Sequence, residues 1–441
     1  MFDEPEKRQD PKPEGDGHID ETNQNASEEE AFSFMQETVK DEQISIKRML
    51  ADFGKLIGRG LIFGTAACVA FCVFQPWIQT RFGSRGSVVE IPQDLEEEES
   101  GASEEKTEEK EEIQQPVLTI DNYRELSRAL YQAALEASKS VVQVEGIDEE
   151  EEIWTDQDFD GGNSAGGVLF ADNGSELLIL APARVSQGAS RIMAAFPDRS
   201  VYEAVVKKQD KNTGIAVYAV PRSRIADSTW AQIQIAVLGN SHSTGRGDTV
   251  IAVGNQFGYA GGIGYGIVSS VRNKISLTDG EFGLLTTDIP AAESGSGVLF
   301  NLNGEVIGLT DQSLSQESKD MVLGYALSDI KKHIEFLSNG KPVPYFGIKG
   351  MEVTKEAAEQ RSIPEGIYVT EVEADSPAMQ AGIKSGDVIE NIGGTKVKTI
   401  SGYKNALLDC NTGDEVRVRG KRQGASGYVN ITFRVTAGSR E

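Results

Sequence analysis

The stretch Thr286–Leu309 reads TTDIPAAESGSGVLFNLNGEVIGL and contains two short apolar runs with a cluster of turn-forming residues between them. The first run is Gly297–Leu299 and the second is Glu305–Leu309, while the residues NLNG fall in between. Short apolar runs separated by Asn and Gly are typical of β-strands joined by tight turns. This part of the chain is therefore predicted to contain a pair of neighbouring strands.

Similar runs continue on the N-terminal side of this stretch, again separated by turn signals such as DNGS and GNQFG. These further runs are Ser140–Val144, Gly167–Phe170, Leu177–Leu180, Ala204–Val206, Ile215–Val220, Thr249–Val253 and Gly266–Val271. Many short strands with regular turns favour all-β barrels or sandwiches over alternating strands and helices. In this part of the chain, helical spacing predicts a helix over 121–138, with Asp121 as its N-cap, and a short helix over Ser328–Leu337.

The overall composition excludes some classes of partner. The chain of 441 residues has 43 basic and 69 acidic residues, a formal net charge of −26, so nucleic acid is not an expected partner. Residues 94–112 contain eleven Asp or Glu and two Lys, and residues 1–42 are also acidic and poor in apolar runs. Both stretches are predicted to be disordered spacers. The three cysteines form no disulfide or zinc pattern, and no metal or cofactor is expected.

One segment has the length and composition of a membrane span. The 21 residues between Arg59 and Arg81 carry no charge, and roughly 20 apolar residues cross a bilayer. The basic residues Lys47, Arg48, Lys55 and Arg59 precede it, against Arg81 and Arg85 after it. This bias predicts a cytoplasmic N-terminus. A buried core helix is the alternative, but the flanking acidic segments offer nothing to cover it.

Four phrases of the chain resemble the protease domain of the HtrA (DegP-like) family. They are SAGGVLFADNGSELLIL, VVKKQDKNTGIAVYAV, LGNSHSTGRGDTVIAVGNQFGYAGGIGYGIVSSV and the opening stretch, and they lie within residues 164–310. The resemblance implies a trypsin-like double β-barrel, a serine peptidase site and a tendency to form trimers. The family's chemistry needs a Ser nucleophile, a His base and an Asp that orients the His.

The resemblance places other residues at the three triad positions. Arg184 occupies the position of the His, Gly214 that of the Asp, and Gly295 that of the Ser. A shift of one residue instead offers Ser294 or Ser296 as the nucleophile. In addition, Glu293 replaces a glycine whose N–H faces the oxyanion, and Arg184 and Glu293 are candidates for an ion pair across the cleft.

These replacements predict an inactive peptidase. A guanidinium has a pKa above about 12 and cannot accept a proton at neutral pH. The three histidines of the chain are His18 in the N-terminal tail, His242 in a turn and His333 in the last helix of this region, and none is expected at the cleft. The alternative is a working endopeptidase that uses Ser294 or Ser296 with an unidentified base.

Residues 342–437 resemble the PDZ domain that follows the protease domain in this family. Tyr345, Phe346, Gly347 and Ile348 match the loop that binds a peptide carboxylate, and SPAMQAGIKSGDVI over Ser376–Ile389 matches a second specific phrase. Successive N–H groups in such a loop form an anion nest. A later helix, Gly402–Cys410, is expected to present Tyr403 and Leu407 to the peptide groove. For Phe346 and Tyr403, packing in the domain core is the alternative.

The expected fold is mainly β: a trypsin-like double β-barrel and a PDZ domain, preceded by one transmembrane helix and disordered acidic segments. The expected divisions are a cytoplasmic tail (1–55), a transmembrane helix (56–80), an extracytoplasmic linker (81–115), a protease-like domain (116–340) and a PDZ domain (341–441). The expected function is that of a membrane-anchored, extracytoplasmic pseudoprotease that binds peptides, protein C-termini or unfolded protein through its PDZ domain. The alternative is an active endopeptidase in envelope protein quality control that uses Ser294 or Ser296. A third hypothesis is regulation of an active relative by mixed trimers.

Overall fold

The computed structural model describes residues 87–94, 119–148, 163–314 and 320–440, all of which belong to one compact unit, 82–441. The expected tail (1–55) and membrane span (56–80) lie outside the described residues, as does most of the acidic linker. Among the described helices, none combines the length and the apolar character that a membrane crossing needs.

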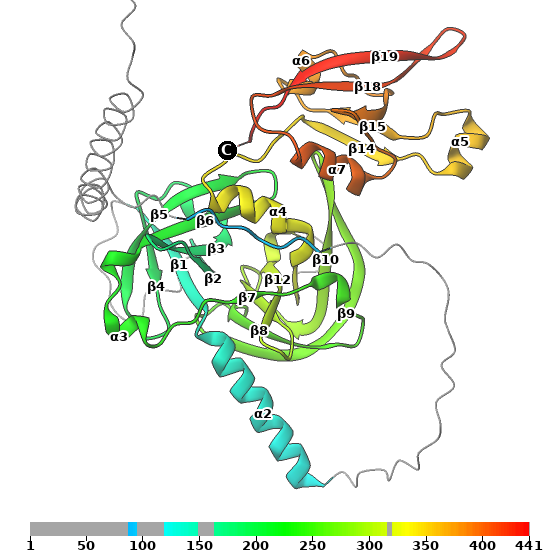
Figure 1. The fold of residues 1–441 in the computed structure, drawn as a ribbon. Coiled ribbons are helices and arrows are strands. Elements are labelled where there is room, and N and C mark those ends of the chain that lie inside the picture. The colour runs from blue at the N-terminus through cyan, green and yellow to red at the C-terminus, as the bar shows by residue number, and fades with distance from the viewer. Residues whose placement is uncertain (1–86, 95–118, 149–162, 315–319, 441) are drawn as a thin grey trace, which may run out of the picture. The chain divides into compact units, whose positions relative to one another are not determined.

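Six antiparallel strands close into a first barrel in the order β1-β2-β3-β6-β5-β4 (Figure 1). They are β1 (Val141–Ile147), β2 (Ser164–Asp172), β3 (Glu176–Pro182), β4 (Arg191–Ala195), β5 (Val201–Asp210) and β6 (Ile215–Pro221). Alternate side chains of a strand point to opposite faces. Leu177 and Ile179 of β3 therefore fill the barrel interior, while Leu178 and Leu180 join a cluster shared with the second barrel.

The second barrel is a sheet in the order β11-β8-β9-β10-β13-β12, which closes because β11 also pairs with β12. Its strands are β8 (Thr249–Asn255), β9 (Gly262–Leu277), β10 (Gly280–Pro290), β11 (Ser296–Phe300), β12 (Glu305–Asp311) and β13 (Met321–Ala326), with β7 (Val237–Leu238) at the edge. Val298 faces Leu309 across the β11–β12 pair. The strand pair and the mainly-β double barrel predicted from the sequence are confirmed.

Two longer helices accompany the barrels. Helix α4 (Leu327–Ser338) buries Ile330, Ile334 and Leu337 at helical spacing, as the sequence predicts. Helix α2 (Ile120–Ser138) begins one residue earlier than predicted, because its N-cap is Thr119 rather than Asp121. The Thr119 side chain accepts a hydrogen bond from the N–H of Asn122, which satisfies a free donor of the first turn.

Short helical turns connect the strands of the barrels. They are η1 (Ala183–Ser186), η2 (Arg222–Arg224), α3 (Asp227–Trp230), η3 (Ser241–Ser243) and η4 (Gln312–Leu314).

Residues 87–94, at the start of the expected linker, lie against the barrels. Ser87 donates its N–H to the carbonyl of Asn173 in the first barrel, and Val89 exchanges hydrogen bonds with the side chain of Asn339 at the end of α4. Ile91 is buried in the shared core. Asp94 pairs with the buried Lys331 of α4 at 2.8 Å. This segment therefore fastens the first barrel to α4.

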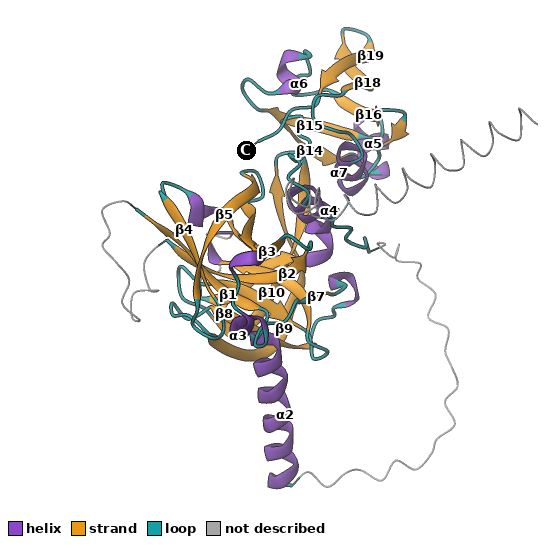
Figure 2. Ribbon diagram, turned by 60° about the vertical axis from the view of Figure 1, so that its left-hand side comes forward, coloured by secondary structure: helices purple, strands orange, loops and turns teal. Residues whose placement is uncertain are grey.

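The C-terminal part forms a smaller sheet with its own core, in the order β14-β15-β16-β18-β19, with β17 paired to β16. Figure 2 shows strands as the dominant element here and in the barrels. Its elements are β14 (Ile348–Glu352), α5 (Lys355–Arg361), β15 (Ile367–Val372), α6 (Pro377–Gln380), β16 (Val388–Ile392), β17 (Thr395–Lys396), α7 (Ile400–Leu408), β18 (Glu415–Gly424) and β19 (Gly427–Thr436). Ser376 caps α6, as expected from its phrase.

Strands β9 and β10 are long and form a hairpin whose turn is Thr278-Asp279. The tip of this hairpin lies beside α7 and β14 of the smaller sheet (Figure 1). The N–H of Asp279 donates to the carbonyl of Ile348 at 2.7 Å. The hairpin thus brings residues of the second barrel into contact with the C-terminal domain.

Candidate functional site

Arg184 lies on η1 and reaches the loop that follows β10. Its guanidinium donates to the carbonyl of Ser164 at 3.0 Å, to the carbonyl of Ser294 at 3.3 Å and to Oγ of Ser296 at 3.3 Å. Its Nε lies 3.7 Å from a carboxylate oxygen of Asp311, whose side chain is 12% exposed. At the position expected for the general base, the structure therefore has a hydrogen-bond donor held by a carboxylate. The expected pair with Glu293 stays a prediction.

Gly214 lies beside η1. Its carbonyl accepts a hydrogen bond from the N–H of Ala183, one residue before Arg184. Gly214 has φ +71, and a Cβ added there would meet no atom within 4 Å. This glycine forms the left-handed turn between β5 and β6, and its assignment to the position of the Asp of the family stays a prediction.

A buried aspartate does lie near this turn, but its carboxylate is already bonded. Asp210 accepts hydrogen bonds from the hydroxyl and N–H of Thr213 and from the N–H of Asn212. Burial raises the pKa of Asp210, while these hydrogen bonds lower it. Because its oxygens cap the turn, Asp210 serves the local structure and is not aimed at the cleft.

The loop 292–297 is closed around Gly295. The N–H of Gly295 donates to the carbonyl of Ala292 at 2.9 Å, and its carbonyl accepts from the N–H of Gln312 at 3.0 Å. A Cβ at residue 295 would lie 2.7 Å from the carbonyl oxygen of Gln256 and 2.9 Å from that of Ala292. In serine peptidases the N–H of the nucleophile residue helps to bind the oxyanion. Here the N–H at that position is bonded within the loop.

The two other serines of the loop differ in exposure. Ser296 is fully buried, and its Oγ accepts hydrogen bonds from the N–H of Gly166 at 3.2 Å and from Arg184. Ser294 is exposed, and its Oγ makes no hydrogen bond within the described part of the chain. Neither hydroxyl is bonded to an imidazole or a carboxylate of the described residues, which is the contact that nucleophile activation requires.

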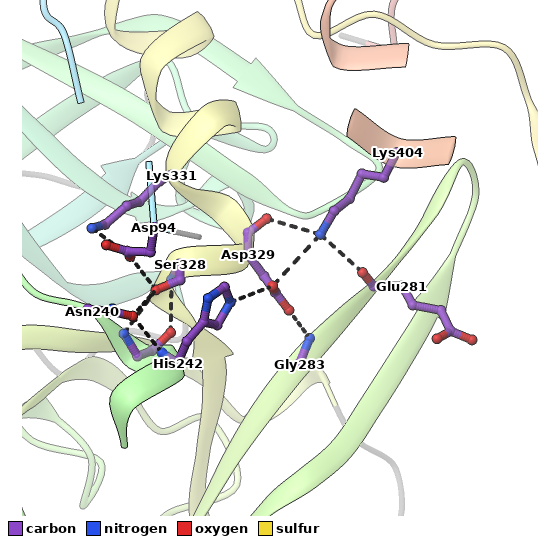
Figure 3. Close-up of polar contacts among 10 residues, drawn as sticks. Asp94, Asn240, His242, Glu281, Gly283, Ser328, Asp329, Lys331 and Lys404 are labelled. Carbon is purple, nitrogen blue, oxygen red and sulfur yellow. Dashed lines mark hydrogen bonds and ion pairs between the residues drawn. The ribbon is translucent and has the colours of Figure 1, made fainter. Parts of the chain in front are cut away.

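Of the two described histidines, His242 contacts helix α4 (Figure 3) and His333 is part of that helix. His242 Nε2 lies 3.4 Å from a carboxylate oxygen of Asp329. His333 is buried edge-on against Phe282. Burial, together with the nearby charge of Lys404, lowers the pKa of His333 to about 3, so its imidazole is neutral at ordinary pH. His18 lies outside the described residues.

Buried amide side chains surround the loop, and the sequence patterns do not single them out. Gln256 donates to Oγ1 of Thr310 at 2.7 Å, but its Oε1 has no partner in the described structure. Both side-chain polar atoms of Gln312 are also buried without a partner there. Asp311 is the last residue of β12 and Gln312 follows it directly, so their only signal in the sequence is a polar pair at the end of a buried strand.

The expected carboxylate-binding loop of the C-terminal domain contains a converging set of N–H groups. Those of Phe346, Gly347 and Ile348 point at the carboxylate of Asp279, at 2.7, 2.8 and 3.1 Å respectively. Gly347 has φ +91, and a Cβ there would lie 2.2 Å from Cβ of Ser376. Only glycine fits this position, and the loop forms an anion nest.

The other expected groove residues are mostly part of the domain core. Phe346 is fully buried, and Tyr403 and Leu407 are each 2% exposed. Tyr345 donates its hydroxyl to the carboxylate of Glu373. Tyr403 has a second role beside packing, because its hydroxyl donates to Asp279 at 2.7 Å.

A cavity of about 280 Å³ lies beside the loop, between the smaller sheet and the β9–β10 hairpin. On the side of the C-terminal domain it is lined by apolar residues that include Ile348, Ile367 and Ile400. On the side of the hairpin it is lined by residues that include Leu277 and Glu281. Apolar lining with a few polar groups is the usual character of a ligand pocket.

Family models match both parts of the chain. A model of the trypsin-like peptidase domain matches residues 165–309, and a model of the PDZ domain matches residues 323–433. Together with the double barrel and the anion nest, these matches define a trypsin-like peptidase fold joined to a PDZ domain.

The relatives to which the chain is similar include two bacterial serine proteases. Serine protease Do-like HtrB of Bacillus subtilis is 28% identical over 288 residues, 60% of this chain and 61% of that protein. The probable periplasmic serine endoprotease DegP-like of Halomonas elongata is 27% identical over 60% of this chain and 55% of that protein. The chain therefore spans less than two thirds of the length of these relatives. Over both of its domains the chain is similar to HtrA-like serine proteases.

Solved structures share the fold. HtrA-type protease AlgW with a tripeptide has a TM-score of 0.52 and 22% identity, covering 70% of this chain and 97% of that chain. AlgW with a decapeptide has a TM-score of 0.51 and 21% identity, with coverage of 70% and 99%.

Proposed function

We propose that this chain is a membrane-anchored, extracytoplasmic HtrA-like pseudoprotease that binds peptide or protein C-termini through its PDZ domain. The observation that carries the absence of peptidase activity is the contact between Arg184 and Ser296. A guanidinium that donates to a serine hydroxyl stabilises its oxygen as an acceptor and cannot remove its proton.

The closed loop supports the same proposal. Because the N–H of Gly295 is bonded to Ala292, it does not face a site where an oxyanion would form. Preorganised donors of this kind contribute about 3–4 kcal/mol to transition-state stabilisation. Loss of the triad Ser or His costs roughly a millionfold in rate, about 8 kcal/mol. With both contributions missing, no useful hydrolysis is expected.

The PDZ loop supports the binding role. Three N–H groups already hold one carboxylate, Asp279, in the way an anion nest holds a peptide C-terminus. The apolar cavity next to the loop offers space for side chains of a bound peptide. AlgW, which shares the fold, has been solved with peptides.

Membrane attachment is proposed from the sequence. Residues 60–80 carry no charge and have the length of a bilayer span, with more basic residues before than after them. This arrangement supports the proposal that the barrels and the PDZ domain lie outside the cytoplasm. Trimer formation, which the family resemblance implies, is checked by measuring the mass of the purified chain in detergent.

The test of the pseudoprotease proposal uses the full chain, casein and a fluorophosphonate probe. We expect no casein hydrolysis and no covalent labelling above that of a heat-denatured sample. Labelling that disappears in Ser294→Ala or Ser296→Ala would instead establish an active endopeptidase. The binding role is tested separately with a library of labelled peptide C-termini, and no detectable binding of any member contradicts it.

A further inference from the structure

The ligand-binding loop of the PDZ domain already contains a carboxylate from the same chain. Asp279 comes from the tip of the β9–β10 hairpin of the second barrel, 67 residues before Phe346. Its two oxygens receive the three N–H groups of the loop and the hydroxyl of Tyr403, which makes four donors in all. A free peptide C-terminus needs the same N–H groups.

The backbone of Asp279 also forms a hydrogen bond of the kind that a bound peptide would form. Its N–H donates to the carbonyl of Ile348, the first residue of β14, at 2.7 Å. A peptide that adds to a sheet edge makes this type of main-chain hydrogen bond. The φ of +61 at Asp279 turns the chain sharply at this point, and Asp tolerates that conformation better than most residues. One residue therefore supplies both the carboxylate and the strand contact.

Flanking contacts hold the hairpin tip in place. Thr278 donates its hydroxyl to Glu373 of the PDZ domain, and its carbonyl accepts from Asn212 of the first barrel at 2.7 Å. On the other side, Lys404 of α7 reaches into the second barrel, where it donates to the carbonyl of Glu281 at 3.3 Å (Figure 3). Asp279 is thus docked by several contacts from both domains.

The contact of Lys404 is buried and specific. Its side chain is 8% exposed, and its Nζ lies 3.9 Å from the carboxylate of Asp329 and 4.6 Å from the ring centroid of Phe282. Asp329 in turn accepts a hydrogen bond from the N–H of Gly283 in β10. A buried ammonium with these partners fixes α7 against the hairpin close to its tip, and α7 is the helix that carries Tyr403.

We propose that Asp279 is an internal ligand that occupies the terminal-carboxylate subsite of the PDZ domain, and that a peptide C-terminus binds only by displacing it. The ligand class, a free carboxylate next to an apolar side chain, rests on the peptide-binding role proposed above. The apolar cavity beside the loop remains available while Asp279 is docked, so the closed part of the groove is the subsite of the last residue.

Replacement of the Asp279 carboxylate by the carboxylate of a peptide is electrostatically reasonable. Burial raises the pKa of Asp279, whereas the N–H donors and Tyr403 lower it. An incoming carboxylate would meet the same donors, so it replaces Asp279 with little change in the local charge. A tethered ligand acts at an effective concentration on the order of millimolar. If Asp279 alone has an intrinsic dissociation constant of about 0.1 mM or lower, peptides are expected to bind the unsubstituted chain at least about tenfold more weakly than an open groove.

Asp279→Asn tests the proposal because it keeps the shape and the turn conformation but removes the charge. Lys274→Gln is the matched control, since it removes a charge from the same hairpin at an exposed residue outside the cavity. Amide hydrogen exchange is measured on the full chain over residues 345–349. We expect faster exchange there in Asp279→Asn and unchanged exchange in Lys274→Gln. Equal exchange in both variants would overturn the proposal.

Peptide binding is the second readout. The probes are fluorescein-labelled decapeptides that end in Leu, Val or Phe with a free carboxylate, and their C-terminally amidated forms. We expect Asp279→Asn to bind the free-carboxylate peptides at least about tenfold more tightly than the unsubstituted chain, and the amidated forms to bind neither. Equal affinity for both chains overturns the internal-ligand proposal. Faster exchange without binding of any peptide supports the docked Asp279 but contradicts the proposed peptide-binding function.

A further variant guards against misfolding of Asp279→Asn. Tyr403→Phe keeps the buried ring and removes only the hydroxyl that donates to Asp279. Partial opening of the loop, seen as a smaller rise in exchange over residues 345–349, is expected. Unchanged exchange in a folded Tyr403→Phe chain together with a folded Asp279→Asn chain would count against the proposal.

Discussion

The contacts of Arg184 come from residues far apart in the sequence. Asp311, whose carboxylate lies 3.7 Å from the guanidinium, comes 127 residues later in the chain. The match of the flanking strand and turn to the family phrase predicts that Arg184 lies at the position of the general base. Its partners were not predictable, since Asp311 and Ser164 come close only once both barrels have closed.

The buried His333 is expected to make the free energy of unfolding depend on pH. Its pKa in the folded chain is about 3, against about 6.5 for an unperturbed histidine. The stability it contributes is therefore fully present above about pH 6.5 and is lost as the pH falls toward 3, by at most about 1.4 kcal/mol per pH unit. In urea unfolding, His333→Leu should flatten the pH dependence in this range.

Unfolding measurements at pH 7–8 separate the effect of His333→Leu on packing from its effect on protonation. There the imidazole is neutral in both the folded and unfolded chains, so any cost of His333→Leu appears as an offset that does not vary with pH. A variant whose unfolding free energy falls as steeply with acid as that of the unsubstituted chain contradicts the prediction.

At the scale of the element, the loop 292–297 is closed to a side chain at Gly295. A methyl group there would meet the carbonyl oxygens of Gln256 and Ala292, both of which are backbone atoms. Gly295→Ala should therefore lower the free energy of unfolding by about 1–3 kcal/mol.

The matched control for this substitution is Gly245→Ala. An added Cβ at Gly245 would only touch the carboxylate of Asp248, at 3.7 Å. Chemical denaturation of both variants measures the difference. If Gly295→Ala is as stable as Gly245→Ala, the loop has room for a side chain, and a serine at residue 295 becomes sterically possible.

The bounds of the strands show which parts of the fold the apolar patterns of the sequence predict. The apolar run Leu177–Leu180 lies within β3, and the predicted strand Gly266–Val271 lies within β9, which however extends to Leu277. The last six residues of β9 are mostly polar; they pair with β10, and only Ile275 and Leu277 among them are partly buried against the shared core. Apolar periodicity gives no signal for such a strand, so the hairpin was missed.

The contact of Asp279 with the PDZ loop was also not predictable from local patterns in the sequence. In the sequence, Thr278-Asp279-Gly280 has the composition of an ordinary turn, and Phe346–Ile348 match a loop that binds an external peptide. The anion nest itself was predictable, because its pattern of an aromatic residue and glycine is local. What fills it depends on how two domains meet, and no pattern within either segment reports that.

At the scale of the whole molecule, the strap formed by residues 87–94 joins separate parts of the fold. Lys331 of α4 is 3% exposed and pairs with Asp94 of the strap at 2.8 Å. Asp94→Asn leaves this buried ammonium without its carboxylate and should lower the free energy of unfolding by about 3 kcal/mol. The control is Glu90→Gln, an exposed residue of the same strap. Equal thermal midpoints for the two variants would contradict the prediction.

This strap has a practical consequence for preparing the protein without its apolar N-terminal segment. A version that starts at helix α2 would lack the hydrogen bonds to Asn173 and Asn339, the buried Ile91 and the partner of Lys331. Soluble versions intended for binding or labelling assays should therefore begin ahead of Ser87, so that the purified fragment keeps the fastening of its first barrel to α4.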